Sequence, residues 1–206
     1  MSDNVMVSSG CVVAMRGKDC VAIGTDRRFS GPSYTAGDEF EKIFSISPRL
    51  YLGLTGLQTD ILTVYHRLAN RKNALEVSTN CVVTPKIAAE LLSHMLYEHR
   101  FAPFYIEPVI AGMDPYTLEP FLCNMDLLGC FDEAPDFVVS GTCVEQLVGM
   151  CESLWNPNQT SRELFDAIAQ VMVVACSRDA VSGCGARIYI IENEKVTVRL
   201  ITTRMD

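Results

Sequence analysis

The sequence lacks the segments that a membrane-spanning or secreted protein needs. No stretch approaches the ~18 consecutive apolar residues that cross a bilayer. The first ten residues, MSDNVMVSSG, contain neither the basic segment nor the long apolar segment of a secretory leader. We therefore expect neither a membrane anchor nor a leader of this kind.

Positive charge is also scarce. The 206 residues include 17 Lys and Arg against 25 Asp and Glu, which gives a formal net charge of −8, and the basic residues are scattered along the chain. Nucleic acids and acidic membranes are bound through concentrated basic patches. The composition therefore argues against both as partners.

The cysteines show no pattern of a metal site or a redox motif. There are nine of them, without a C-x-x-C pair. The three histidines, His66, His94 and His99, do not cluster with them at the spacing of zinc ligands. We expect reduced, mostly buried thiols, as in a cytosolic or nuclear protein, with no metal and no other cofactor.

Apolar residues are abundant, at 49% of the chain. The length suits one domain with a sizeable core, and no linker, repeat or low-complexity run interrupts it. This apolar share is high for a soluble domain, and surplus apolar surface is often buried between subunits. The composition thus favours a single domain that joins an assembly.

Strand patterns alternate with consecutive pairs of helix patterns along the chain. Strands are expected at 11–15, 20–25, 43–45, 50–54, 108–112, 120–124, 137–140, 187–191 and 196–202, and helices at 57–68, 84–100, 144–155 and 160–175.

Two of the helices begin with clear capping signals. Thr84 suits an N-cap and Pro85 the first helical position. Thr160 and Glu163 match a capping box. Ile87, Leu91 and Met95 fall on one face of the second helix, and the expected apolar face of the fourth helix is formed by Leu164, Ile168, Met172 and Ala175.

The order of elements decides between fold classes. Helices occur in pairs rather than singly between strands, which argues against a doubly wound parallel sheet. Strands such as CVVAM and IYII are apolar throughout, as in sheets that are covered on both faces. We therefore predict an α+β fold, a four-layer αββα sandwich of two antiparallel sheets flanked by helix pairs.

Three motifs in this frame resemble those of proteasome β subunits, which are N-terminal-nucleophile hydrolases. They are CVAIGTDRRFSG, EKIFSISPRLYLGLTG and SRDAVSGCG, in the family's order and spread over nearly the whole chain. The stretches EPVIAGMDP, DFVVSGT and GMCESLW are similar to the beta type-3 subunit of the 20S core particle in particular. The resemblance implies an N-terminal extension at 1–9 and a single β-type domain at 10–206.

Active members of this family begin, after propeptide removal, with a threonine that attacks the peptide carbonyl. Its free α-amine or a nearby water acts as the base, and a lysine, aspartates and a backbone N–H support the reaction. Thr142 matches a position where active members have serine, which is a departure that keeps a hydroxyl. The other matching residues are Asp26, Lys42, Gly56, Asp179 and Ser182.

The nucleophile's position does not hold a threonine. In the family it precedes the first aspartate by sixteen residues, and counting back from Asp26 gives Gly10. Ser9 and Cys11 are possible substitutes, but a shift of one residue along a strand turns a side chain to the opposite face. The sequence therefore favours a noncatalytic chain. Asp26 and Lys42 then form a structural ion pair, and a self-processed hydrolase using Ser9 or Cys11 is the alternative.

The resemblance also implies partners and a place of action. They are the adjacent beta type-2 and beta type-4 subunits, the α ring, and polypeptide substrates in ubiquitin-dependent degradation, in cytoplasm and nucleus. The beta type-3 subunit lends a wall to the substrate pocket of its trypsin-like neighbour, and Asp126, Cys130 and Asp132 match that wall. A free-standing binding protein of similar fold is a third possibility.

Overall fold

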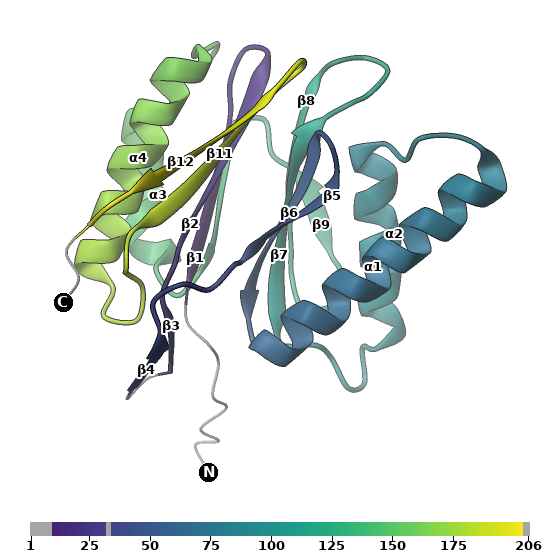
Figure 1. Ribbon diagram of the computed structural model, residues 1–206, viewed down its shortest axis with the longest axis horizontal. Coiled ribbons are helices and arrows are strands. Elements are labelled where there is room, and N and C mark those ends of the chain that lie inside the picture. Colours follow the sequence, from purple (N-terminus) through teal and green to yellow (C-terminus); the bar gives the residue numbers. More distant parts are fainter. Residues whose placement is uncertain (1–9, 32–33, 204–206) are drawn as a thin grey trace.

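The computed structural model describes residues 10–31 and 34–203. Two five-stranded antiparallel sheets lie face to face, and each carries a pair of helices on its outer side (Figure 1). This arrangement confirms the predicted four-layer sandwich. Residues 1–9, the expected N-terminal extension, lie outside the described part of the chain.

The first sheet has the strand order β10-β1-β2-β11-β12. Because β1 pairs with β2 across a tight turn and also with β10, it lies inside the sheet. Helices α3 and α4 cover the outer face of this sheet. The bounds are β1 Cys11–Arg16, β2 Cys20–Asp26, β10 Phe137–Gly141, α3 Val144–Leu154, α4 Ser161–Arg178, β11 Ala186–Glu192 and β12 Val196–Ile201.

The second sheet has the order β5-β6-β7-β8-β9 and is covered by α1 and α2. A separate two-stranded sheet, β3-β4, lies near the start of β1 (Figure 1). The bounds are β3 Phe29–Gly31, β4 Tyr34–Gly37, β5 Ile43–Ser47, β6 Leu50–Gly56, α1 Gln58–Thr79, α2 Pro85–Glu98, β7 Ile106–Met113, β8 Pro120–Met125 and β9 Phe131–Glu133.

The alternation of β1 side chains assigns them to different layers of the core. Cys11 and Val13 face α3 and α4, whereas Val12 and Ala14 face the second sheet. This period of two is the geometry of any strand. A residue at position 10 is therefore on the inter-sheet side, and a residue at position 11 is on the helix side.

The helix caps agree with the sequence signals. The Thr84 hydroxyl accepts from the Ile87 N–H at 3.3 Å. Thr160 accepts from the Glu163 N–H at 3.4 Å, while Glu163 accepts from the Thr160 N–H at 2.9 Å. Each contact satisfies an otherwise unpaired donor in the first turn.

The three residues that share one face of α2 in the sequence pattern differ in their burial. Ile87 is 39% exposed, and Leu91 is half-buried, whereas Met95 is fully buried. The helix instead buries Ala88, Ala89 and Leu92. Small residues allow the helix to lie close to the sheet, so tertiary packing rather than side-chain size selects its inner face.

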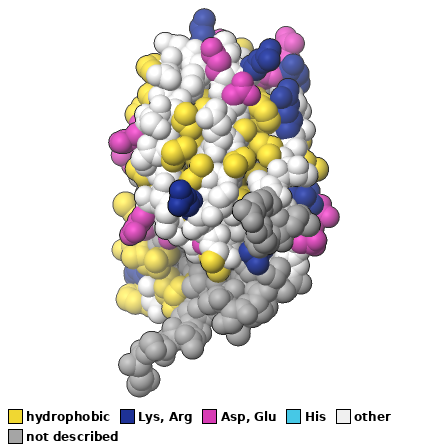
Figure 2. All heavy atoms as spheres, turned by 90° about the vertical axis from the view of Figure 1, so that its left-hand side faces the viewer, with side chains coloured by type: hydrophobic (Ala, Val, Ile, Leu, Met, Phe, Trp, Pro, Cys, Tyr) yellow, Lys and Arg dark blue, Asp and Glu magenta, His cyan; other side chains and the backbone are white. Residues whose placement is uncertain are grey.

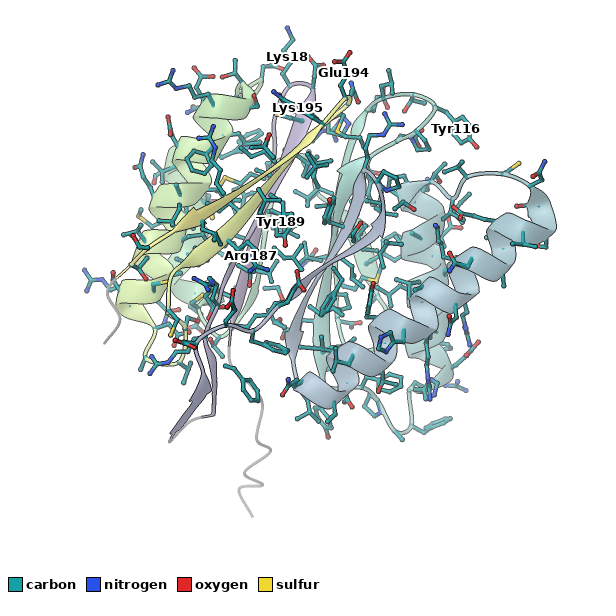
Figure 3. All side chains as sticks on the ribbon, viewed as in Figure 1. Lys18, Tyr116, Arg187, Tyr189, Glu194 and Lys195 are labelled. Carbon is teal, nitrogen blue, oxygen red and sulfur yellow. The ribbon has the colours of Figure 1, made fainter. Side chains whose placement is uncertain are left out.

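Side chains fill the space between the sheets (Figure 3). Tyr189 packs against Tyr51 of the second sheet with ring centroids 5.2 Å apart, and Arg187 pairs with Glu39 and Glu41 at 3.3 Å. No helix within the described ranges has both the length and the apolarity to cross a bilayer. No group of His, Cys, Asp or Glu among these residues is arranged to hold a metal ion.

Candidate functional site

The site begins with a buried ion pair. Asp26 ends β2, Lys42 immediately precedes β5, and the Lys42 ammonium donates to Asp26 Oδ1 at 2.6 Å. The side chains are 0% and 2% exposed respectively. Charges at such depth need a partner, because an isolated buried charge is strongly unfavourable.

Backbone donors complete the environment of the Asp26 carboxylate. Oδ1 also accepts from the Cys11 N–H at 3.0 Å. Oδ2 accepts from the N–H groups of Arg28 at 3.2 Å and Gly183 at 3.3 Å. One carboxylate therefore fixes the start of β1, the end of β2 and the loop before β11 around Lys42.

Gly10 lies directly beside this lysine. A Cβ placed on Gly10 would lie 2.4 Å from Lys42 Nζ and 2.7 Å from its Cε, well inside van der Waals contact. The glycine also has φ +152°, a backbone conformation that L side chains rarely adopt. The lysine side chain thus fills the space into which a side chain at position 10 would project.

A second cluster of hydroxyls surrounds Asp179, which caps the C-terminal end of α4. Its Oδ2 accepts from the Thr142 hydroxyl at 2.5 Å and from the Ser182 hydroxyl at 2.6 Å. The Thr142 N–H donates to the Gly10 carbonyl at 3.1 Å. The structure therefore brings Thr142, Asp179 and Ser182 together beside Gly10.

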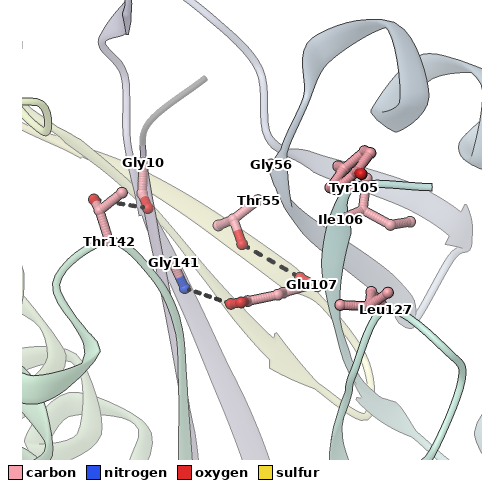
Figure 4. A pocket seen from close by; sticks show the side chains of 9 residues that line it. All are labelled: Gly10, Thr55, Gly56, Tyr105, Ile106, Glu107, Leu127, Gly141 and Thr142. Atoms are coloured by element: carbon pink, nitrogen blue, oxygen red, sulfur yellow. Dashed lines mark hydrogen bonds between the residues drawn. The ribbon is translucent and has the colours of Figure 1, made fainter. Parts of the chain in front are cut away.

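Gly56, at the end of β6, lies against the backbone of the neighbouring strand. A Cβ there would be 2.1 Å from the Tyr105 carbonyl oxygen, and φ is +121°. Only glycine allows this approach. Gly56 lines the same cavity as Gly10 (Figure 4).

That cavity has a volume of about 250 Å³. Thr55, Glu107 and Gly141, which line the cavity, take part in a polar network between the two sheets. Thr55 and Ser140 share a hydrogen bond of 2.7 Å, and Glu107 Oε2 accepts from the Gly141 N–H at 3.1 Å. Sequence reasoning missed Glu107 because a single polar residue at the start of an apolar strand carries no distinguishing signal.

The three residues expected to serve a neighbouring pocket lie around the β8–β9 turn. Asp126, Cys130 and Asp132 are all exposed. Asp126 Oδ1 accepts from the N–H groups of Leu128 at 2.9 Å and Cys130 at 2.8 Å, which fixes the turn. Asp126 also lines a cavity of about 560 Å³ with Thr142, so this turn adjoins the Gly10 region.

Cys11 is poorly suited to nucleophilic attack. It is fully buried on the helix side of β1, within the core beneath α3 and α4. A hydrogen bond with Cys143, burial and the nearby Asp26 carboxylate raise the pKa of the Cys11 thiol well above its ordinary value. The reactive thiolate is therefore disfavoured. Ser9 lies outside the described residues.

Known proteins of similar sequence form a consistent group. The family model described as "Proteasome subunit" matches residues 6–191. "Proteasome subunit beta type-3" of Drosophila melanogaster is 58% identical over 97% of both chains, and that of Saccharomyces cerevisiae is 43% identical over 100% of both. The Caenorhabditis elegans protein of the same name is 40% identical over 97% of both chains.

The family match spans most of the chain, and the relatives match it at nearly full length. Together with the four-layer sandwich, they establish that the chain belongs to the proteasome subunit family, in which it is a β subunit most like the beta type-3 subunits.

Proposed function

We propose that the chain is a noncatalytic member of the β ring of the 20S core particle. The observation that carries this proposal is Gly10. It has no nucleophilic side chain, and the Lys42 ammonium occupies the space that such a side chain would need, 2.4 Å from where its Cβ would lie. Asp26 and Lys42 then stabilise the fold instead of assisting catalysis.

The alternative, a self-processed hydrolase, would use Ser9 or Cys11. The burial of Cys11, its raised pKa and its place on the helix side of β1 argue against the cysteine. Determining the N-terminus of the mature chain tests both substitutes. The proposal expects a chain that does not begin at either residue, and a start at Ser9 or Cys11 would favour the hydrolase.

The proposed partners are the adjacent beta type-2 and beta type-4 subunits, the α ring and the polypeptide substrates of ubiquitin-dependent degradation in cytoplasm and nucleus. Exposed apolar side chains support a protein with several interfaces. They include Val148 in α3 and Val173 in α4. Figure 2 shows the side of the molecule where these two helices lie, with apolar side chains gathered near its middle. Co-migration with a particle of roughly thirty times the chain's mass would support the assembly, whereas migration as a free chain would favour the free-standing binding protein.

We also propose that the β8–β9 turn supplies an acidic wall to the neighbouring trypsin-like pocket. Asp126 and Asp132 are exposed and carry the negative charge that a basic substrate side chain would meet. An attraction of roughly 1–4 kcal/mol is expected at contact distance, depending on the dielectric.

This role is tested with particles that carry Asp126→Asn and Asp132→Asn. Since Asp126 also fixes the turn, Asp132→Asn alone serves as the variant with less structural effect. The proposal expects cleavage after basic residues to fall more than cleavage after acidic or apolar residues. Equal changes in all three would show that the turn does not contribute to the pocket.

A further inference from the structure

A cleft in this chain has the chemistry of a binding site in its own right. The cavity of about 250 Å³ beside Gly10 adjoins the cavity of about 560 Å³ beneath the β8–β9 turn. They share four lining residues, Glu107, Leu127, Gly141 and Thr142. We refer to the two cavities together as the Glu107 cleft.

Apolar side chains form much of the wall of the smaller cavity. Tyr105 and Ile106 line one side, and Leu127 reaches it from the β8–β9 turn (Figure 4). Tyr105 is 48% exposed and Leu127 38%, so the wall is open to a molecule that approaches from solvent. Such a surface suits an aliphatic chain that carries a polar group at its end.

Glu107 lies where the two cavities meet. Its Oε2 accepts from the Gly141 N–H at 3.1 Å and the Ser140 hydroxyl at 3.3 Å, and these contacts orient the carboxylate. No side-chain nitrogen of a Lys or Arg in the described residues lies within 4.0 Å of a Glu107 carboxylate oxygen. The carboxylate is thus positioned by neutral donors and has no cationic partner within the described residues.

The charge of the whole cleft has one sign. Glu107 lines both cavities, Asp126 and Glu145 line the larger one, and neither lining includes a Lys or Arg. Residues 1–9, MSDNVMVSS, contain no basic residue either, so the segment before Gly10 carries no basic side chain to pair with Glu107. Charge complementarity therefore calls for a cation from another molecule.

We propose that the Glu107 cleft binds a lysine or arginine side chain of an extended polypeptide, with the apolar stem against Tyr105, Ile106 and Leu127 and the cationic group at Glu107. An arginine can pair with a carboxylate through two parallel hydrogen bonds. This binding goes beyond the acidic wall proposed for the neighbouring subunit, because it uses the chain's own cavity and a residue outside that wall.

The experiment uses intact core particles whose active sites are covalently blocked, so that the probe is not cleaved. The probe is an acetylated, amidated peptide with one central arginine and a photoreactive diazirine residue beside it. A second peptide of the same length has citrulline, which is uncharged, in place of arginine. Mass spectrometry then locates the crosslinks on this chain.

In unmodified particles, we expect the arginine peptide to label residues 105–107 at least about threefold more than the citrulline peptide. Competition by free arginine amide should lower this labelling. Equal labelling by both peptides would overturn the proposal without any variant. Labelling confined to residues 126–133, which belong to the acidic wall of the β8–β9 turn and β9, would overturn it as well.

Variants then assign the effect to one carboxylate. Glu107→Gln keeps the size of the side chain and removes its charge, and should abolish the preference for arginine over citrulline. Glu119→Gln, an exposed glutamate outside both cavities, is the matched control and should leave the preference unchanged. An undiminished preference in Glu107→Gln, or an equal loss in Glu119→Gln, would contradict the proposal.

Discussion

Replacing Lys42 by methionine should destabilise the chain severely. The Asp26 carboxylate would keep its backbone donors but lose the ammonium that lies 2.6 Å from Oδ1, at a depth where it is 0% exposed. Removing one partner of a buried ion pair typically costs about 3–5 kcal/mol, because the remaining charge stays buried without its counterion. We expect Lys42→Met to lower the free energy of unfolding by that amount.

The measurement is urea unfolding followed by fluorescence of Trp155. It is the only tryptophan, and its indole N–H donates to the Arg16 carbonyl at 2.9 Å, so its environment reports on the packing of the first sheet. Lys195→Met is the control. Lys195 pairs with Glu192 at 3.5 Å but is 69% exposed, and its loss should change the free energy of unfolding by less than about 0.5 kcal/mol.

The double variant Asp26→Asn with Lys42→Met separates the ion pair from packing effects. It removes both charges, so its destabilisation should be smaller than the sum of the two single variants by about 2–3 kcal/mol. If Lys42→Met costs less than about 1 kcal/mol, or if the two changes are additive, the pair is not the buried, coupled interaction that its geometry indicates.

Three further experiments test the surroundings of the site. Gly10→Thr should give this chain no peptide hydrolysis of its own in the assembled particle. It should also lower the free energy of unfolding by about 1–3 kcal/mol, because the threonine Cβ would overlap the Lys42 ammonium. A gain of hydrolysis by this chain would contradict the inference that Lys42 fills the space beside Gly10. Gly56→Ala should lower the free energy of unfolding in urea by at least about 2 kcal/mol, because the added Cβ would overlap the Tyr105 carbonyl oxygen. Gly149→Ala in α3 is the control, since nothing lies within 4 Å of its Cβ, and it should raise the free energy of unfolding by about 0.5–1 kcal/mol. Equal effects of the two variants would contradict the close contact of Gly56 with Tyr105. Iodoacetamide should alkylate the exposed cysteines of the native chain well before Cys11, as followed by peptide mass spectrometry, and fast modification of Cys11 at neutral pH would contradict its burial and raised pKa.

Much of the fold was predictable because its local signals agree with its packing. The caps at Thr84 and Thr160 and the apolar strands led to the four helices and nine of the twelve strands of the described residues in the right order. The inner face of α2 could not be predicted from its large apolar residues, because the helix buries Ala88 and Ala89 while Ile87 is 39% exposed. Strands β3, β4 and β9 were missed because three or four residues are too few to show alternation.

The sequence likewise predicted some residues of the site and missed others. Motif spacing led to Asp26 and Lys42, which the structure joins by a hydrogen bond of 2.6 Å. It could not reveal that Lys42 fills the space beside Gly10, because that depends on the path of the lysine side chain between the sheets. Glu107 was also beyond reach, since its importance arises from its contact with Gly141 on the opposite sheet.

The most direct test of the central claim is the mass of this chain after the intact core particle is treated with a saturating peptide epoxyketone, which reacts with N-terminal nucleophiles. If Gly10 leaves the site without a nucleophile, the chain should keep its untreated mass while the catalytic subunits of the same particle gain the inhibitor. An adduct on this chain that maps to Ser9 or Cys11 would contradict the account and establish the chain as a hydrolase.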